Sequence, residues 1–166
     1  LPEGYEYNFL LDGQVYIDPW AYGISGRERF GAAIDPEAHK VRCTFWNPGD
    51  YDWEGDQCLN TPYHEMILYK LHVRGYTKAN SQIKGKKGTF QALEEMIPYW
   101  QELGINAIEM MPVYEFMETV PEKYYAGSMV SEKKVNKKVN YWGYTAGYYM
   151  APKRSYSATN DPAQEI

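Results

Sequence analysis

An aromatic block late in the sequence contains the residue types that bind sugars. The block is Tyr141-Trp142-Gly143-Tyr144, and Tyr148-Tyr149 follow shortly after it. Tyrosine and tryptophan rings cover the C–H face of a pyranose at little conformational cost, and tyrosine hydroxyls form hydrogen bonds with sugar hydroxyls. A loop that buries its rings would have the same composition. Sugar contact and a packed loop are therefore comparable interpretations of this block.

Hydrolysis of a glycosidic bond uses two carboxyl groups, and the sequence identifies no obvious pair. Glu94 and Glu95 are neighbours in a predicted helix and point apart, so we expect them on a solvent-exposed face. Glu109 lies inside a predicted strand and Glu115 lies just beyond its end. Either of these two could reach a cleft, but neither has a recognisable partner in the sequence.

Metal and nucleophile motifs are equally weak. An acidic connector could hold a hard cation, but it lacks calcium-loop spacing, so we expect turn chemistry from its members Asp50, Asp52, Glu54 and Asp56. His72 stands beside Arg74 in a predicted strand, where a structural hydrogen bond is the commoner role, and His39 and His64 are distant in sequence. No nucleophile elbow, phosphate loop or dinucleotide fingerprint occurs. We therefore predict no metal site and no cofactor.

The two cysteines are too few for a structural zinc site. Cys43 and Cys58 are separated by 14 residues without a CxxC motif. We expect two buried or partly buried thiols rather than a disulfide. No Asn-x-Ser/Thr sequon argues for a secretory route, so we expect a cytoplasmic protein without excluding secretion.

Length and charge exclude several classes of protein. The 166 residues suit one domain or a domain plus a fragment, because a (β/α)₈ barrel needs roughly 250 residues. The 17 Lys and Arg against 22 Asp and Glu give a net charge of −5, which argues against a nucleic-acid binder. No apolar run approaches the ~18 residues of a membrane span, so we expect no membrane partner.

The first 46 residues have the pattern of short β-strands. Tyr5, Tyr7 and Phe9 alternate with polar residues, and Asp12-Gly13 predicts a hairpin turn before a return strand at 15–17. A further strand is expected where Val41, Cys43 and Phe45 alternate with polar residues. Two or three strands cannot cover both faces of a sandwich, so this region reads as the end of a β domain.

Residues 47–65 read as an irregular connector, and a strand–helix–strand unit follows. The apolar runs 66–73 and 105–112 predict strands buried on both faces of a parallel sheet. Thr89 is expected to cap the intervening helix, Pro98 to kink or restart it, and Gly104 to end it. One helix face would carry Phe90, Leu93, Ile97, Trp100 and Leu103. We therefore predict a βαβ unit whose strands pair in parallel.

The remaining residues, 113–166, show no sustained periodicity. They read as a long loop that leaves the carboxyl end of the second strand, where ligands bind in α/β folds. Lysine runs at 84–87 and 133–138 are expected in solvated loops.

Several segments together resemble glycoside hydrolase family 13, the α-amylase family, and within it the glycogen-debranching, isoamylase and pullulanase group. The segments that carry this resemblance are Tyr51-Asp52-Trp53-Glu54-Gly55-Asp56, Leu71-His72-Val73-Arg74-Gly75-Tyr76-Thr77 and Asn140-Tyr141-Trp142-Gly143-Tyr144. Weaker support comes from Lys86-Lys87-Gly88-Thr89-Phe90, Glu102-Leu103-Gly104-Ile105, Met111-Pro112-Val113 and Tyr149-Met150-Ala151-Pro152. Their order and spacing cover essentially the whole chain.

The resemblance implies an α/β fold that is only part of a barrel. Residues 1–46, with Asp18-Pro19-Trp20-Ala21, resemble the C-terminal strands of a carbohydrate-binding β-sandwich of family 48. Residues 47–65 would be the connector, and 66–166 the first βαβ unit and long loop of a (β/α)₈ TIM barrel.

The resemblance also implies retaining hydrolysis of α-glucans such as glycogen, starch or maltooligosaccharides, most simply at α-1,6 branch points. The family's catalytic Asp, Glu and second Asp come from later strands, so no catalytic residue falls in this chain, which is expected to be inactive alone. Tyr144 corresponds to the residue that stacks under the sugar whose bond is cleaved, with Trp142 beside it.

Two departures from the family pattern bear on specificity. Lys70 stands where the family usually carries Glu before Leu-His-Val-Arg-Gly. Thr145-Ala146 replaces the Asp-Pro of the pullulanase motif, which favours the isoamylase-like branch. A pullulanase or α-amylase of other linkage preference, a non-catalytic α-glucan-binding module, and an interaction fragment with exposed strand edges remain alternatives.

Overall fold

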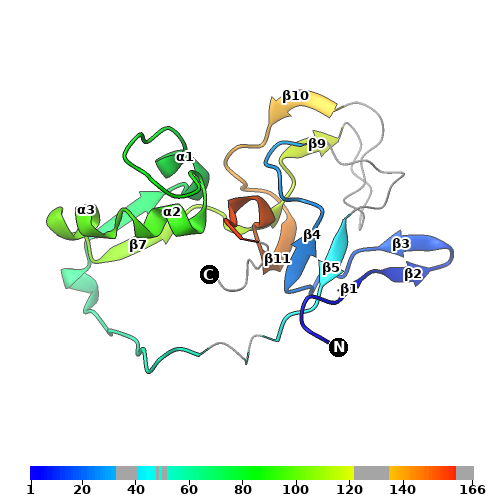
Figure 1. Ribbon diagram of the computed structural model, residues 1–166, viewed down its shortest axis with the longest axis horizontal. Helices are drawn as coiled ribbons and strands as arrows, with labels where there is room; N and C mark the ends of the chain where they lie inside the picture. Colours follow the sequence, from blue (N-terminus) through cyan, green and yellow to red (C-terminus); the bar gives the residue numbers. More distant parts are fainter. Residues whose placement is uncertain (33–40, 48, 50–51, 122–134, 160–166) are drawn as a thin grey trace.

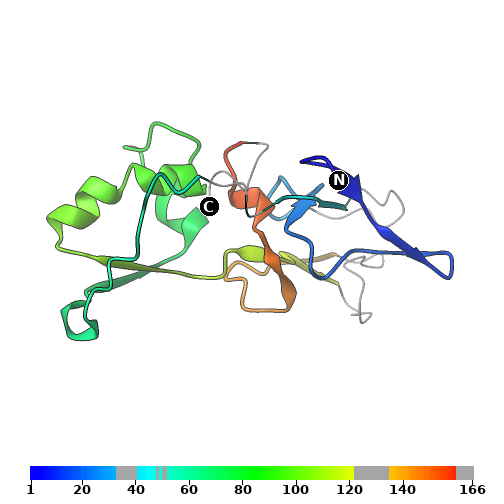
Figure 2. The same ribbon diagram turned by 90° about the horizontal axis from the view of Figure 1, so that it is seen from below.

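The computed structural model describes residues 1–32, 41–47, 49, 52–121 and 135–159. The described elements form two lobes, one with the α-helices and one made mostly of short strands (Figure 1). Seen from below, the chain after residue 110 runs directly from the helical lobe to the strand-rich lobe (Figure 2). Among all the described residues, no helix has the length and apolar character needed to cross a membrane.

The N-terminal residues form the short strands expected from their alternation. An antiparallel sheet has the order β1 (Glu6–Tyr7), β5 (Arg42–Thr44), β4 (Gly23–Ser25). A separate hairpin pairs β2 (Phe9–Leu11) with β3 (Gln14–Tyr16). The φ angles of Asp12 and Gly13 are 51° and 77°, which is the left-handed pair that a two-residue type I′ turn requires. The hairpin predicted from Asp12-Gly13 is therefore confirmed.

The central segment forms the predicted βαβ unit. Strands β6 (Leu68–Leu71) and β7 (Ala107–Met110) pair in parallel, with Lys70 opposite Glu109. Three short helices lie between them, α1 (Val73–Lys78), α2 (Phe90–Glu94) and α3 (Ile97–Glu102). The parallel pairing predicted for 66–73 and 105–112 is confirmed, although both strands are shorter than expected. A 3₁₀ turn, η2 (Tyr63–Glu65), precedes β6. Helix α1 begins at Val73, two residues after the end of β6.

The helix signals in the sequence act as expected. Thr89 Oγ1 accepts a hydrogen bond from Ala92 N at 3.3 Å, and Pro98 stands in the first turn of α3, so the helix restarts there. Gly104 has φ 75° directly after the last helical turn. Phe90, Leu93 and Trp100 are buried. Ile97 and Leu103 are about half exposed, so their assignment to the buried face was wrong; the restart at Pro98 breaks the single helical stripe.

The two parallel strands are not buried on both faces, contrary to the sequence prediction. Leu68 is 52% exposed and Met110 is 43% exposed, whereas Leu71 is buried. Leu71 and Tyr69 pack with residues of α2 and α3, whereas Leu68 lies on the opposite face of the sheet together with Lys70 and Glu109. Apolar side chains left exposed on a two-stranded sheet are stabilised by burial against another layer.

The described residues after position 112 do not form the long irregular loop that we predicted for 113–166. β8 (Tyr114–Phe116) pairs antiparallel with β11 (Gly147–Pro152), and β9 (Thr119–Pro121) pairs with β10 (Val135–Val139). A 3₁₀ turn, η3 (Arg154–Tyr156), follows β11. Lys137 and Lys138 lie in β10, so the loop prediction fails there, while Lys133 and Lys134 are outside the described residues. β8 and β9 have only three residues each, which is too few to show periodicity.

Both hydrophobic clusters depend on residues from this segment. In the strand-rich lobe, Met117, Tyr148 and Ala151 pack with residues of the N-terminal strands, namely Ala21, Ile24, Val41 and Cys43. In the helical lobe, Phe116 and Tyr156 pack with residues of the βαβ unit, namely Leu71, Val73, Phe90, Leu93 and Trp100. The segment after β7 therefore joins the two lobes.

The cysteines are free thiols, as expected, but only one is protected. Cys43 is fully buried and Cys58 is exposed, so the prediction of two buried thiols was wrong for Cys58. Burial raises the pKa of the Cys43 thiol to about 11, and its Sγ accepts a hydrogen bond from Asp18 N at 3.1 Å.

We predict that Ellman's reagent at pH 8 titrates one thiol rapidly and the second only after unfolding in guanidinium. The reason is that the Cys43 thiol is both buried and protonated at this pH. The Cys58→Ser variant should have no rapidly reacting thiol. Rapid reaction of folded Cys58→Ser would contradict the buried position of Cys43.

Candidate functional site

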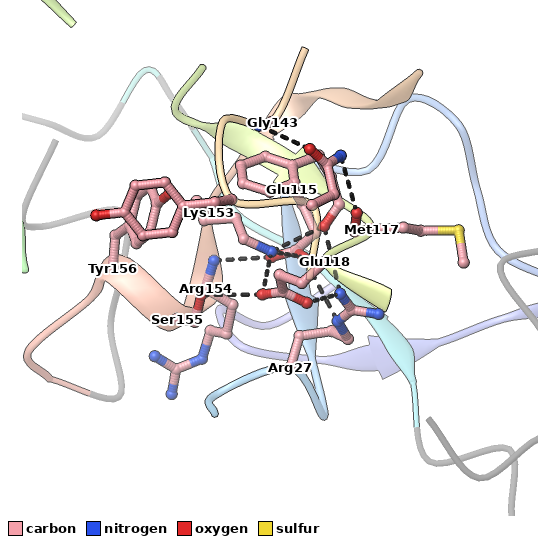
Figure 3. A network of polar contacts seen from close by, with 12 residues as sticks. Arg27, Glu115, Met117, Glu118, Gly143, Lys153, Arg154, Ser155 and Tyr156 are labelled. Carbon is pink, nitrogen blue, oxygen red and sulfur yellow. Dashed lines mark hydrogen bonds and ion pairs between the residues drawn. The ribbon is translucent and has the colours of Figure 1, made fainter. Parts of the chain in front are cut away.

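A buried ion network lies beneath the region that bears the aromatic block. It comprises Arg27, Glu115, Glu118 and Lys153, all less than 5% exposed (Figure 3). Lys153 Nζ lies 2.6 Å from Glu115 Oε1 and 2.7 Å from Glu118 Oε1. The Arg27 guanidinium contacts the same two carboxylates, with Nε 3.5 Å from Glu115 Oε1 and Nη2 paired with Glu118. Two cations and two anions balance, as burial of charge requires.

Further hydrogen bonds extend the ion network. The second Glu115 oxygen accepts from Arg154 N at 2.8 Å, and Ser155 Oγ donates to Glu118 at 3.3 Å. Lys153 Nζ also donates to Phe116 O at 2.8 Å. Glu115 is thus a structural residue, and its burial and ion pairs contradict the possibility that it reaches a cleft. Its main partner, Lys153, is 38 residues away in sequence and gave no local signal.

Glu109 also has a partner that its sequence neighbours did not indicate. Lys70 Nζ lies 2.5 Å from Glu109 Oε1 across the parallel strands, and both side chains are 46% exposed. The pKa of Lys70 is raised, chiefly by the Glu109 carboxylate and to a smaller extent by the Tyr144 phenol. The Lys70–Glu109 pair therefore lies at the predicted sugar-binding tyrosine.

The remaining acidic candidates stabilise turns. The Glu95 carboxylate accepts hydrogen bonds from Lys84 N and Gly85 N, which lowers its pKa, while Glu94 is exposed. In the connector, Asp52 accepts from Glu54 N at 2.8 Å, which confirms turn chemistry there. Asp50 lies outside the described residues. Among those that are described, no three His, Cys, Asp or Glu side chains are grouped to hold a metal ion.

His72 anchors the start of the aromatic block. Its Nδ1 accepts from Gly75 N at 2.9 Å and so caps α1. Nε2 then carries the hydrogen and lies 2.7 Å from Tyr141 O. The His72 and Tyr141 rings stack, with their centroids 4.3 Å apart and 7° between their planes. The structural role predicted for His72 is confirmed.

The aromatic platform, defined as Tyr141, Trp142 and Tyr144, is an exposed surface on a packed base. Trp142 is 55% exposed and Tyr144 is 64% exposed. Between them Gly143 has φ 81°, and a Cβ at this position would collide with the buried Phe116 ring. The structure therefore brings both predicted sugar-contact residues to one short turn and leaves their rings accessible.

Tyr114 fixes the turn that carries Tyr144, a role that no sequence pattern indicates. Its hydroxyl donates to Thr145 O at 2.8 Å and lies 3.1 Å from Gly143 O, so it contacts the carbonyls on both sides of Tyr144. Burial raises the pKa of the Tyr114 phenol, with a further contribution from Tyr149. A protonated donor is therefore available at neutral pH.

Curated relatives align with nearly the whole chain. Isoamylase 1, chloroplastic, of Arabidopsis thaliana is 32% identical over 162 residues, which is 95% of this chain and 19% of the relative. The glycogen operon protein GlgX homolog of Haemophilus influenzae is 29% identical over 182 residues, covering 98% of this chain and 26% of the relative. The chain thus spans about a fifth to a quarter of these relatives. No family model matches it.

Solved structures give the same fold. A product complex of the multi-modular glycogen-degrading pneumococcal virulence factor SpuA has a TM-score of 0.65 and 20% identity, over 98% of this chain and 18% of that one. The GBS pullulanase SAP in complex with maltotetraose has a TM-score of 0.59 and 21% identity, over 90% of this chain and 19% of that one. At this identity the similarity establishes an α/β fold shared with amylase-type enzymes.

We predict that Lys153→Met lowers the free energy of unfolding by about 3 kcal/mol, because it leaves two buried carboxylates without their shared cation. Urea denaturation followed by circular dichroism measures this change. Lys70→Met is the matched control, since it breaks an exposed Lys–Glu pair and should change stability far less. Equal effects of the two substitutions would refute the structural importance of the ion network.

We predict that Tyr114→Phe, which removes only the hydroxyl, increases amide hydrogen exchange at residues 143–147 by about fivefold. The physical reason is the loss of a hydrogen bond that contributes roughly 1 kcal/mol to holding the turn. Exchange in α2 should stay at the wild-type rate. Unchanged exchange across the turn would show that Tyr114 does not hold it.

Proposed function

We propose that this chain, which belongs to the isoamylase and glycogen-debranching group of glycoside hydrolase family 13, forms a substrate-binding part of an α-glucan hydrolase. The reaction would be retaining hydrolysis, with α-1,6 branch points of glycogen or starch as the substrate bonds. The activity belongs to the whole protein, because the matched relatives are about four to five times longer than the aligned segment.

The observation that carries the proposal is the exposure of Trp142 and Tyr144 on a fixed base. Rings that served only as core would be buried, whereas these are 55% and 64% exposed. His72 fixes one side of the turn and Tyr114 fixes the other. A rigid aromatic face loses little entropy when a sugar stacks on it, which is what an α-glucan subsite requires.

The catalytic carboxylates would come from outside these residues. Glu115 and Glu118 are buried and already paired with cations, and Glu109 is paired with Lys70. A retaining glycosidase needs two carboxyl groups roughly 5 Å apart that face the substrate. The three carboxylates nearest the platform therefore support a binding role and not a catalytic role for this chain.

The proposed architecture is the start of a (β/α)₈ barrel. Residues 66–166 would contain the first βαβ unit and its long insertion, 47–65 the connector, and 1–46 the end of a β-sandwich. The parallel pairing of β6 with β7 supports this assignment. So do the exposed apolar side chains Leu68 and Met110 of these strands, which further barrel strands and the residues inside the barrel would cover.

Linkage specificity rests on the aromatic turn. Thr145-Ala146 after Tyr144 favours an isoamylase-like enzyme over the Asp-Pro form of pullulanases. The similar structures include a pullulanase in complex with maltotetraose, so a pullulanase or α-amylase of other linkage preference is the alternative enzyme. A cytoplasmic location, with secretion as the alternative, stays a prediction from the sequence.

One observation favours a second candidate, a non-catalytic α-glucan-binding module. The exposed rings and the neutralised carboxylates are what such a module would also show. The two candidates differ in the residues that follow in the full-length protein, where a debranching enzyme needs a later strand with Asp and Asn-His residues.

We predict that the chain binds maltohexaose and that Tyr144→Ala and Trp142→Ala each weaken binding at least about fivefold, because an aromatic stacking contact contributes roughly 1 kcal/mol. Isothermal titration calorimetry measures the affinities. Trp20→Ala is the matched control, since Trp20 is 72% exposed but lies outside the platform. The chain should release no reducing sugar from glycogen or pullulan.

Two results would each contradict part of the proposal. Wild-type affinity in both platform variants would contradict sugar binding at the platform. Turnover of glycogen or pullulan by the pure chain would contradict the assignment of catalysis to residues outside it.

A further inference from the structure

A second exposed tyrosine lies on β11, the strand that follows the aromatic platform. Tyr149 is 65% exposed, although Tyr148 before it and Ala151 after it are buried. The pairing of β11 with β8 shifts register between Tyr148 and Pro152. This irregularity allows both Tyr149 and Met150 to be exposed, where strict alternation would expose only one of two neighbours.

The Tyr149 ring is supported by a packed neighbour, Tyr114. It packs against the Tyr114 ring with centroids 4.7 Å apart and 58° between the planes. Tyr114 is itself fixed by its hydroxyl, which contacts the carbonyls of Gly143 and Thr145. An exposed ring with a fixed orientation offers a flat apolar face at small entropic cost.

Tyr144 and Tyr149 share Tyr114 as a neighbour. The hydroxyl of Tyr114 contacts the backbone on both sides of Tyr144, and its ring supports Tyr149. Both exposed phenols lie close enough to raise the pKa of the Tyr114 phenol. The Tyr149 ring and the turn that carries Tyr144 therefore contact the same side chain, Tyr114.

We infer that Tyr149 forms a second sugar subsite, which binds a neighbouring glucose unit of the α-glucan whose first unit stacks on Tyr144. This inference rests on the proposed function, because it assumes that Tyr144 binds an α-glucan. A glucan chain can bridge two such rings, with the Tyr149 hydroxyl available to hydrogen-bond a sugar hydroxyl. Tyr149 then determines the preference for longer chains and Tyr144 determines binding itself.

The test compares maltose with maltohexaose by calorimetry, because only the longer ligand gains much from an additional subsite. Tyr149→Ala should lower the affinity for maltohexaose about fivefold and leave that for maltose unchanged. Tyr149→Phe, which keeps the ring, should stay near wild type. Tyr63→Ala removes a 90% exposed tyrosine elsewhere and should change neither affinity.

Failure of the inference is distinguishable from failure of the proposed function. Wild-type maltohexaose affinity in Tyr149→Ala, or an equal loss for both ligands, overturns the second subsite. If Tyr144→Ala still weakens maltohexaose binding at least about fivefold in that case, the proposed function stands. Circular dichroism of each variant, together with the folded behaviour of Tyr149→Phe, shows whether a loss reflects unfolding.

Discussion

The structure depends on a balance of charge in its interior. Lys153 places one ammonium between Glu115 and Glu118, and the Arg27 guanidinium contacts the same two carboxylates. Removing any one of these ions leaves an uncompensated buried charge, which costs far more than the pair itself contributes. The strand-rich lobe must therefore bring Arg27, β8 and the end of β11 together.

The position of the aromatic platform follows from that constraint. Glu115 is the central residue of β8, so the ion network fixes the strand that begins with Tyr114. Tyr114 in turn holds the carbonyls around Tyr144, while the buried Phe116 ring leaves room only for glycine at position 143. His72, at the end of β6, completes the support from the helical lobe. Accessible rings on a rigid base are what stacking against a sugar requires.

Local signals in the sequence predicted local structure well. Asp12-Gly13 gave the hairpin, Pro98 gave the restart of the helix, and two apolar runs gave the parallel pair. The pattern failed where stability comes from distant contacts. β8 has only three residues and pairs with β11, which lies more than 30 residues later in the sequence, so no local periodicity reveals this pair.

The candidate site was predictable in the same uneven way. Composition and the family resemblance identified Trp142 and Tyr144, whose exposure agrees with a binding role. The residues that hold them were not identified, because Tyr114 and Lys153 act through contacts 31 and 38 residues apart. A lysine or tyrosine in isolation carries no sign of such a partner. Likewise, nothing near Glu115 in the sequence indicates that its cation is Lys153.

The central claim is that an α-glucan lies over the platform, and indole NMR signals test it most directly. Trp20, Trp53 and Trp142 are all more than half exposed, at 72%, 65% and 55%. Titrating the ¹⁵N-labelled chain with maltohexaose should shift the Trp142 Nε1–H signal and leave those of Trp20 and Trp53 in place. A shift of Trp20 or Trp53 without Trp142, or no shift at all, would contradict the account.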